Sequence, residues 1–135
     1  MKLPRFGVEE WLNVHEKSAI YDIAGVSIKA LTMEELFDLS GLDKEAFFAQ
    51  LLKIKMDYGW IEGSPEFKTQ VSSLYKDMPV DNILQTNGAT GATMLALYAL
   101  IEPEDHVISM YPTYQQLYDI PKSLGADVDL WAVEE

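Results

Sequence analysis

The stretch that decides the fold is NILQTNGATGA, residues 82–92. Its first residues, 82–85, are typical of a short strand, and the polar residues 86–91 are typical of a tight turn. An apolar run follows the turn and predicts a helix over residues 91–101. A strand, a turn and a helix in this order are the beginning of an α/β unit.

The turn at the start of this helix is also a candidate anion site. Gly88 allows the backbone to turn sharply, and the N–H groups of Gly88, Ala89 and Thr90 follow one another at the helix N-terminus. Such a terminus carries about half a positive charge and favours a phosphate dianion. The Thr90 hydroxyl can add one more donor. Spacing alone favours the simpler interpretation, an ordinary polar turn, because neither a Gly-x-Gly-x-x-Gly nor a Walker pattern is present.

The residues after this helix continue the alternation. The sequence predicts a strand over residues 106–110, a helix over 114–124 that ends at Gly125, and a third strand over 127–133. Strand, helix, strand, helix, strand at this pitch indicates parallel pairing with right-handed crossovers. We therefore expect an α/β fold from Pro79 onward.

The residues before Pro79 have a mostly helical pattern. Thr32, Asp43 and Ser64 are residue types whose side chains accept the first free N–H groups of a helix. Thr32 with Glu35 also forms a capping-box pattern. The expected helices are residues 8–20, Thr32 to Gly41, Asp43 to Tyr58, and Ser64-Pro65 onward.

The helix over residues 91–101 is apolar on opposite sides. One side carries Ala92, Leu95, Ala96 and Ala99, and the other carries Met94, Leu97, Tyr98 and Ile101. A helix that is apolar all round must be covered all round. Because the predicted strands and amphipathic helices cannot supply that cover, we expect the chain to be a piece of something larger or to dimerise through this helix.

Composition excludes several classes of protein. The chain has 135 residues, of which 48% are apolar and 24% charged, a globular composition. It has no cysteine, so a disulfide scaffold and a thiolate metal site are excluded. Ten basic residues against 22 acidic ones give a net charge of −12, which argues against nucleic acid as a partner. The apolar runs are too short for a membrane span and no secretory pattern opens the chain, so we expect a cytoplasmic protein that binds no membrane.

A second candidate ligand contact follows the second predicted strand. The residues Tyr111-Pro112-Thr113-Tyr114 lie at its C-terminal end, where parallel sheets bind ligands. An aromatic ring at this place can lie flat on a planar ligand ring. The alternative is that Tyr114 is the first core residue of the helix that follows.

Together these stretches resemble the start of the large domain of class I and II aminotransferases, which are fold-type I enzymes that use pyridoxal 5′-phosphate (PLP). The matching stretches are residues 82–92, 102–108, 111–114 and 124–128, with Tyr58-Gly59 and residues 63–67 before them. The resemblance implies the N-terminal part of the PLP-dependent transferase-like fold in incomplete form, with a helical N-terminal segment and then the first βαβαβ of the large domain. It divides the chain into an N-terminal arm and small-domain segment (residues 1–41), a helical linking segment (42–78) and the start of the PLP-binding large domain (79–135).

The same resemblance implies the roles of individual residues. Gly88, Ala89 and Thr90 would form the cup for the cofactor phosphate, and Tyr114 would stack on the pyridine ring. Tyr58 would reach the phosphate of the neighbouring subunit's cofactor, because the sites of this family lie at a dimer interface. A homodimer that acts on an amino acid and a 2-oxo acid is therefore expected of the complete enzyme.

The resemblance also shows which parts of the family's site these residues do not match. The lysine that binds the cofactor covalently, the aspartate on the pyridine nitrogen and the arginine on the substrate carboxylate come later in the family than this chain extends. We therefore expect the chain alone to be inactive, and no catalytic residue is assigned. His15 lies on the apolar face of its expected helix, and His106 has no second histidine near it in the sequence, so no metal is expected.

The sequence is compatible with other functions. A carbon–sulfur lyase or a decarboxylase of the same fold would share these stretches, because later residues decide which bond breaks. A non-catalytic fragment or pseudoenzyme, acting only in dimerisation or anion binding, is also compatible with the missing lysine. A small nucleotide-binding module is disfavoured, because Arg5 is the only arginine and the glycine-rich pattern is absent.

Overall fold

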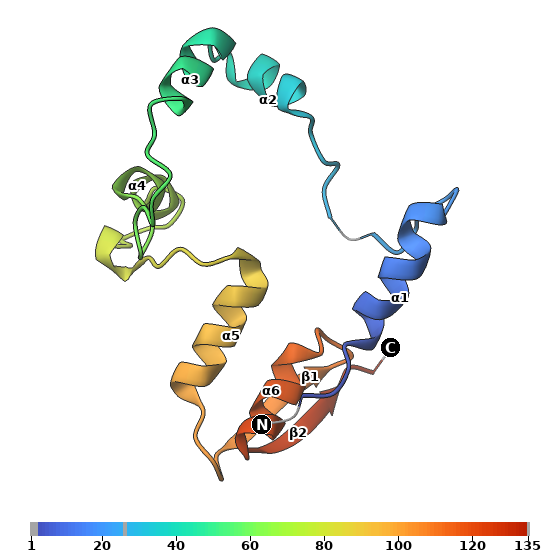
Figure 1. Cartoon of the computed structure of the whole chain (residues 1–135). Helices are drawn as coiled ribbons and strands as arrows, with labels where there is room; N and C mark the ends of the chain where they lie inside the picture. The colour runs from blue at the N-terminus through green and yellow to red at the C-terminus, as the bar shows by residue number, and fades with distance from the viewer. Residues whose placement is uncertain (1–2, 26, 135) are drawn as a thin grey trace. The chain divides into compact units, whose positions relative to one another are not determined.

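Helices and two strands make up the computed structural model, which describes residues 3–25 and 27–134 (Figure 1). The chain divides into two compact units, and each has its own packing. Unit 1 consists of Met1–Leu12 with Trp60–Glu135, and unit 2 consists of Asn13–Gly59. The three segments expected from the family resemblance are a different division and stay a prediction.

The first helix, α1, covers Gly7–His15 and is followed by the short 3-10 helix η1, Glu16–Ser18. The helix was expected to continue to residue 20, which is wrong. The Ser18 hydroxyl donates a hydrogen bond to the carbonyl of His15 at 3.0 Å. Side chains of this type compete with the next helical turn for carbonyl groups, and the tighter 3-10 turn ends the helix.

Helix α2, Met33–Ser40, begins and ends where its sequence signals predict. The Glu35 N–H donates to Thr32 Oγ1 at 3.1 Å, and the Thr32 N–H donates to Glu35 Oε2 at 2.8 Å, which completes the capping box. Gly41 ends the helix in the left-handed conformation at φ 67°. The hydrogen bond from the Thr32 backbone, with a smaller contribution from Lys29, lowers the pKa of Glu35.

Helix α3, Lys44–Leu51, starts as predicted but ends early. Asp43 accepts a hydrogen bond from the Ala46 N–H at 3.0 Å and caps the helix. The expected continuation to Tyr58 is wrong, because the N–H of Ile54 bonds only three residues back, to Leu51, at 3.1 Å. Such bonds tighten the chain out of the α-helical path.

The packing of unit 2 is centred on three aromatic rings. Phe37 of α2 is buried, and its ring centroid lies 5.2 Å from that of Phe47 and 5.9 Å from that of Phe48. The rings of Phe47 and Phe48 are 5.5 Å apart. The Phe37–Phe47 and Phe47–Phe48 pairs are edge to face, a geometry that is favourable beyond the apolar area that it buries.

Unit 1 contains the remaining elements. They are α4 Pro65–Ser72, the 3-10 helix η2 Val80–Asn82, α5 Gly88–Leu100, β1 His106–Tyr111, α6 Gln116–Leu124 and β2 Asp127–Ala132 (Figure 1). Ser64 caps α4 by accepting from the Phe67 N–H at 3.1 Å, with Pro65 at the first helical position, as predicted.

The first predicted strand is wrong. Asn82 belongs to η2, and residues 83–86 have no strand partner within the described ranges 3–25 and 27–134. The Gln85 N–H instead donates to the Glu62 carbonyl in a loop at 3.0 Å. A strand exists only through pairing, and the described residues pair only β1 with β2. The expected βαβαβ is therefore observed as a helix followed by one βαβ unit.

The βαβ unit itself follows the prediction. Strands β1 and β2 are parallel, with a register that runs from His106 opposite Asp127 to Tyr111 opposite Ala132. Helix α6 connects them and ends at Gly125, whose φ is 98°. The α/β character expected after Pro79 is confirmed.

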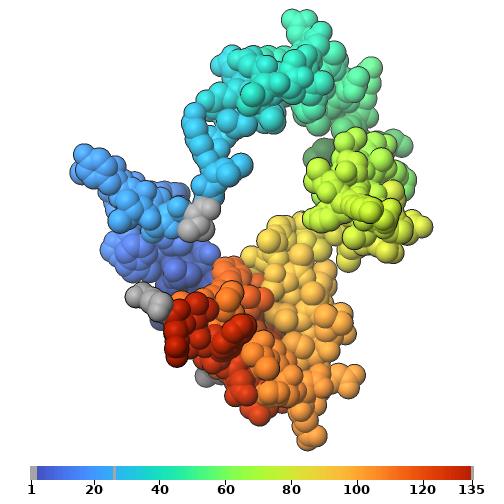
Figure 2. Space-filling view, turned by 180° about the vertical axis from the view of Figure 1, so that it is seen from behind, coloured from blue at the N-terminus to red at the C-terminus, as the bar shows by residue number. Residues whose placement is uncertain are grey.

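Helix α6 covers one face of this sheet. Ile120 and Pro121 of α6 are buried, and Ser109 of β1 is buried on the side that faces the helix. The rings of Tyr111 and Tyr118 lie 6.0 Å apart. Figure 2 shows the atoms of α5, α6 and the two strands as one continuous body, in yellow to red.

The other face of the sheet and much of α5 are uncovered. Ile108, Met110 and Trp131 share that face and are 66%, 53% and 69% exposed. None of the side chains of α5 is buried. Parallel sheets are normally covered on both faces, so these surfaces agree with the expectation that the chain lacks part of its packing. Within the described residues no helix is long and apolar enough to cross a membrane.

Candidate functional site

The site is built on the first turn of α5, which begins three residues earlier than predicted, at Gly88. Gly88 has a φ of 72°, a conformation that disfavours any side chain, and its Cβ position is open space. The Thr86 hydroxyl donates to the Gly88 carbonyl at 2.9 Å, and the Gly88 N–H donates to the Thr86 carbonyl at 3.0 Å. These two bonds hold the turn that leads into the helix.

The N–H groups of Ala89 and Thr90 point out of this first turn. Helix geometry gives them no acceptor inside α5. The side chain of Asn87, at the N-cap position, makes no capping hydrogen bond. Among the described residues no other acceptor pairs with either group, and the first turn carries no acidic residue. The turn therefore offers two free donors in a region of positive potential.

Tyr114 approaches this turn from a distant part of the sequence. It lies in the loop between β1 and α6, beyond the C-terminal end of β1. Its hydroxyl oxygen lies 3.1 Å from Thr90 Oγ1, within hydrogen-bonding distance. The structure thus brings the two features that the sequence singled out, the turn of residues 88–90 and the tyrosine, into one place.

Two further residues belong to this place and were not predicted from the sequence. The ring of Phe6 meets the ring of Tyr114 edge to face, with centroids 4.9 Å apart and planes at 78°. Gln115 binds the chain on both sides of Phe6, at Arg5 and Gly7. No periodicity or motif links residues this far apart in the sequence.

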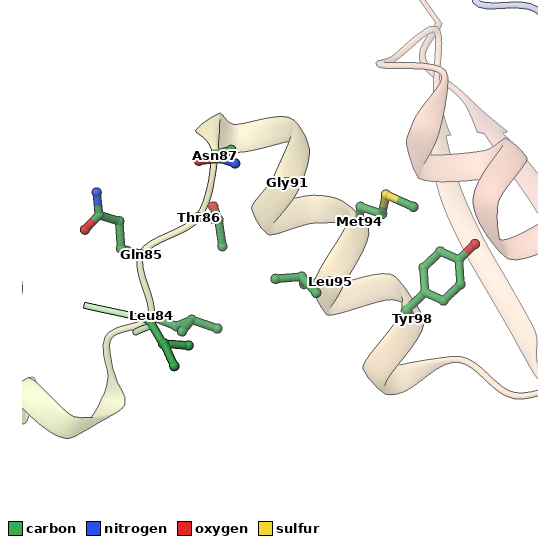
Figure 3. Close-up of a pocket in the computed structure, with 9 residues that line it drawn as sticks. Leu84, Gln85, Thr86, Asn87, Gly91, Met94, Leu95 and Tyr98 are labelled. Atoms are coloured by element: carbon green, nitrogen blue, oxygen red, sulfur yellow. The ribbon is translucent and has the colours of Figure 1, made fainter. Parts of the chain in front are cut away.

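A hollow of about 710 Å³ lies beside the start of α5 (Figure 3). It is lined by Ile61, Leu84, Gln85, Thr86, Asn87, Gly91, Met94, Leu95 and Tyr98. Figure 3 shows Leu95 pointing toward the segment that carries Leu84 and Thr86. Thr90 and Tyr114 are not among the lining residues, so the hollow is a part of the uncovered surface of α5 next to the candidate site.

Tyr58, the remaining predicted site residue, belongs to unit 2 and is fully exposed. Its role at a cofactor phosphate stays a prediction. Residues 3–25 and 27–134 hold no group of three side chains that could bind a metal ion. His106 Nε2 lies 2.9 Å from Asp129 Oδ2 across the two strands.

One ionisable group near the site has a shifted pKa. Burial, then the neighbouring charges of Asp119 and Tyr111, raise the pKa of Tyr118 above its usual value. Each of these effects disfavours the phenolate. Tyr118 therefore stays neutral throughout the physiological range and contributes packing under the sheet.

Comparisons with known proteins agree with this geometry. The family described as aminotransferase class I and II matches residues 44–135. A crystal structure of a PLP-dependent aminotransferase from Streptococcus suis is 72% identical to this chain, with a TM-score of 0.94. That match covers 100% of this chain and 36% of the other.

Two more distant structures share the fold. A PLP-dependent cyclase, OrfR, is 24% identical with a TM-score of 0.84, and the match covers 100% of this chain and 35% of the other. An aminotransferase from Mycobacterium tuberculosis is 20% identical with a TM-score of 0.73, covering 98% and 36%. No curated protein matches.

The chain thus spans little more than a third of the length of the solved relatives that it matches. The family match covers more than half of the chain and includes both the first turn of α5 and Tyr114. The α/β fold class expected from the resemblance is confirmed, although residues 82–85 form no strand with the described residues. This chain belongs to the class I and II aminotransferase family.

Proposed function

We propose that this chain supplies the N-terminal part of a PLP-dependent aminotransferase, which in its complete form exchanges an amino group between an amino acid and a 2-oxo acid. The observation that carries the proposal is the 3.1 Å contact between Thr90 Oγ1 and the Tyr114 hydroxyl. It places a phosphate-type donor set and an aromatic ring next to each other. When bound, PLP supplies the electron sink that this chemistry needs.

The donor set at the start of α5 fits a phosphate group. The free N–H groups of Ala89 and Thr90 and the Thr90 hydroxyl are donors, and phosphate oxygens are acceptors. Gly88 leaves open space where a side chain would approach an anion. The first turn has no carboxylate to repel it. We therefore propose that Ala89 and Thr90 donate to the phosphate of PLP, and that Gly88, whose N–H is bound to the Thr86 carbonyl, contributes the open turn beside it rather than a donor.

The ring of Tyr114 fits the pyridine ring of the cofactor. Its hydroxyl is hydrogen-bonded to Thr90, so the hydroxyl end of the ring lies at the proposed phosphate cup and the rest of the ring extends away from it. A planar ligand whose phosphate sits on the cup would lie against this ring in an offset stack. This arrangement orients the cofactor from two directions, by charge at one end and by aromatic contact along its plane.

We further propose that the complete enzyme is a cytoplasmic homodimer in which Tyr58 contacts the phosphate of the partner subunit's cofactor. The full exposure of Tyr58 leaves its hydroxyl available for a contact of this kind. The proposal predicts that Tyr58→Phe weakens cofactor binding only in the dimer. Sedimentation equilibrium of the complete enzyme, with PLP titrations above and below the dimer dissociation constant, measures this.

We propose that the residues that carry out the chemistry lie outside these 135, as the family resemblance implies. The chain alone is therefore proposed to bind no PLP covalently at a defined lysine. Borohydride reduction of PLP mixed with the isolated 135 residues is expected to label its lysines without preference. Stoichiometric labelling of one lysine would contradict this and would identify that lysine as the nucleophile.

The phosphate assignment has a direct test in the complete enzyme. Thr90→Val removes one hydroxyl donor to an anion, which is expected to weaken pyridoxamine 5′-phosphate binding by roughly 10-fold, about 1.4 kcal/mol. Thr90→Ser keeps the hydroxyl and should retain most of the affinity. Thr69→Val is a matched control, because the Thr69 hydroxyl only donates to the Pro65 carbonyl in α4, at 2.7 Å. If Thr90→Val and Thr69→Val have equal affinities, the Thr90 hydroxyl does not bind the phosphate and the turn has only a structural role.

A further inference from the structure

Residues 3–7 form a short N-terminal arm at the start of the chain, and Phe6 of this arm contacts Tyr114 of the candidate site. The ring centroids of Phe6 and Tyr114 are 4.9 Å apart, and their planes cross at 78°. Both residues belong to unit 1. Aromatic rings in contact prefer this edge-to-face geometry, so the pair favours one orientation of each ring.

The arm is held in place by the residue next to Tyr114. The Gly7 N–H donates to Gln115 Oε1 at 3.3 Å, and Gln115 Nε2 donates to the Arg5 carbonyl at 2.9 Å. One side-chain amide therefore binds the backbone immediately before and immediately after Phe6. Gln115 Nε2 also donates to Asp119 Oδ2 at 2.7 Å, which orients the amide.

We infer that the N-terminal arm is a positioning element of the cofactor site, in which Phe6 sets the plane of the Tyr114 ring. The inference rests on the proposed function, since it concerns the ring that would stack on PLP. Thr90 fixes one end of Tyr114 through its hydroxyl, but a single hydrogen bond at the end of a ring leaves the ring free to turn. Phe6 removes that freedom.

The physical advantage is that the ring is ordered before the ligand arrives. A stacking ring that must be ordered during binding costs conformational entropy, and a ring that is already held does not. The contribution of Phe6 should therefore appear in the binding of a planar ring and be absent from the binding of phosphate alone. This difference separates positioning from simple packing.

The experiment uses the complete enzyme without cofactor and measures the Kd of pyridoxamine 5′-phosphate by calorimetry. This probe carries no aldehyde, so a covalent bond to lysine does not mask the effect. Phe6→Ala is expected to weaken its binding by roughly 2- to 12-fold, the range of an aromatic pair. The Kd of inorganic phosphate should stay unchanged. Phe6→Tyr keeps an aromatic edge and should restore the affinity.

A double-mutant cycle tests whether Phe6 acts through Tyr114. Phe6→Ala in a Tyr114→Ala background is expected to add no further loss. Val8→Ala is the matched control, since Val8 follows the arm closely in the sequence and its side chain is exposed. Phe6→Leu is the second variant if Phe6→Ala fails to fold, because it keeps an apolar side chain and removes the ring.

The failure of this inference is distinguishable from the failure of the proposed function. If Tyr114→Ala leaves the Kd of pyridoxamine 5′-phosphate unchanged, Tyr114 is no stacking residue and the proposed site is overturned. If Tyr114→Ala weakens binding but Phe6→Ala does not, the inference is overturned alone. Additive losses, or an equal loss for pyridoxamine 5′-phosphate and inorganic phosphate, would also overturn it, because Phe6 would then act through the general stability of the fold.

Discussion

The hydroxyl groups of Thr90 and Tyr114 lie 3.1 Å apart, although the two residues are 24 positions apart in the sequence. Thr90 comes from the first turn of α5, and Tyr114 comes from the loop after β1. The contact joins a helix N-terminus, which suits an anion, to an aromatic ring, which suits a planar ring. A ligand that carries both an anionic group and a planar ring, such as a pyridine phosphate, can contact both residues. A ligand with only one of these groups can contact only one of them.

Tyr114→Phe tests the contact itself. The substitution keeps the ring and its edge against Phe6 and removes only the hydroxyl that faces Thr90. A neutral hydrogen bond contributes about 0.5–1.5 kcal/mol, so the affinity of the complete enzyme for pyridoxamine 5′-phosphate should fall by roughly 2- to 12-fold. Calorimetry measures this, and Tyr75→Phe, which removes an exposed hydroxyl elsewhere in unit 1, should have no effect. Equal Kd values for the two variants would mean that the contact does not orient Tyr114.

Gly88→Ala tests the turn that opens α5. The φ of 72° at Gly88 places a new Cβ in the left-handed region, which costs about 1–2 kcal/mol. The urea midpoint of the complete enzyme is therefore expected to fall. Gly91→Ala is the matched control, because its Cβ would meet Thr86 at an ordinary 3.5 Å and alanine is favoured inside a helix. Should Gly91→Ala lose as much stability as Gly88→Ala, backbone conformation would not be the reason for the glycine.

The capping box of α2 predicts that the local stability of this helix depends on pH. The pKa of Glu35 is lowered below its ordinary value of 4.5, chiefly by the Thr32 backbone, so the carboxylate stabilises the fold above that pH. This stabilisation is lost as the pH falls below 4.5 through the lowered pKa. Hydrogen exchange of the α2 amides, corrected for the intrinsic rate, should show protection that falls over this range.

Two variants check the capping box. Glu35→Gln should remove most of the pH dependence, whereas Glu34→Gln, next to it and outside the capping box, should keep it. Thr32→Ala should cost about 1 kcal/mol of local stability by removing the side-chain cap. A pH profile that is the same for Glu35→Gln and the unmodified protein would exclude Glu35 as the titrating group.

The uncovered surfaces predict how the 135 residues behave in isolation. Helix α5 has no buried side chain, and Ile108, Met110 and Trp131 are exposed on one face of the sheet. Apolar surfaces of this kind on an isolated chain favour self-association or poor folding. Sedimentation velocity at micromolar concentration, with hydrogen exchange on the same sample, tests this. A compact monomer with strongly protected amides in α5 would show that the isolated chain needs no further cover.

Local signals in the sequence predicted most of the secondary structure. Thr32, Asp43 and Ser64 cap their helices as expected, and Gly125 ends α6. Each of these signals acts over a few residues, so the local sequence is enough to predict where these helices begin or end. The pair of strands around α6 was predictable for the same reason, because a βαβ unit is formed by neighbouring segments.

Non-local features were not predictable from local pattern. Residues 82–85 have a strand-like pattern, but a strand needs a partner and the described residues supply none for them. The contact of Phe6 with Tyr114 joins residues more than 100 positions apart in the sequence, and no signal in the sequence points to it. The residues proposed for the phosphate cup were suggested by the family resemblance, since the spacing alone favoured an ordinary turn.

The first turn of α5 and the ring of Tyr114 are proposed to hold the cofactor. A crystal structure of the complete enzyme with pyridoxamine 5′-phosphate tests this proposal most directly. We predict phosphate oxygens at hydrogen-bonding distance, about 2.7–3.2 Å, from the N–H groups of Ala89 and Thr90, with the pyridine ring stacked on Tyr114. A phosphate bound elsewhere, with the first turn of α5 contacting only protein or solvent, would contradict the account.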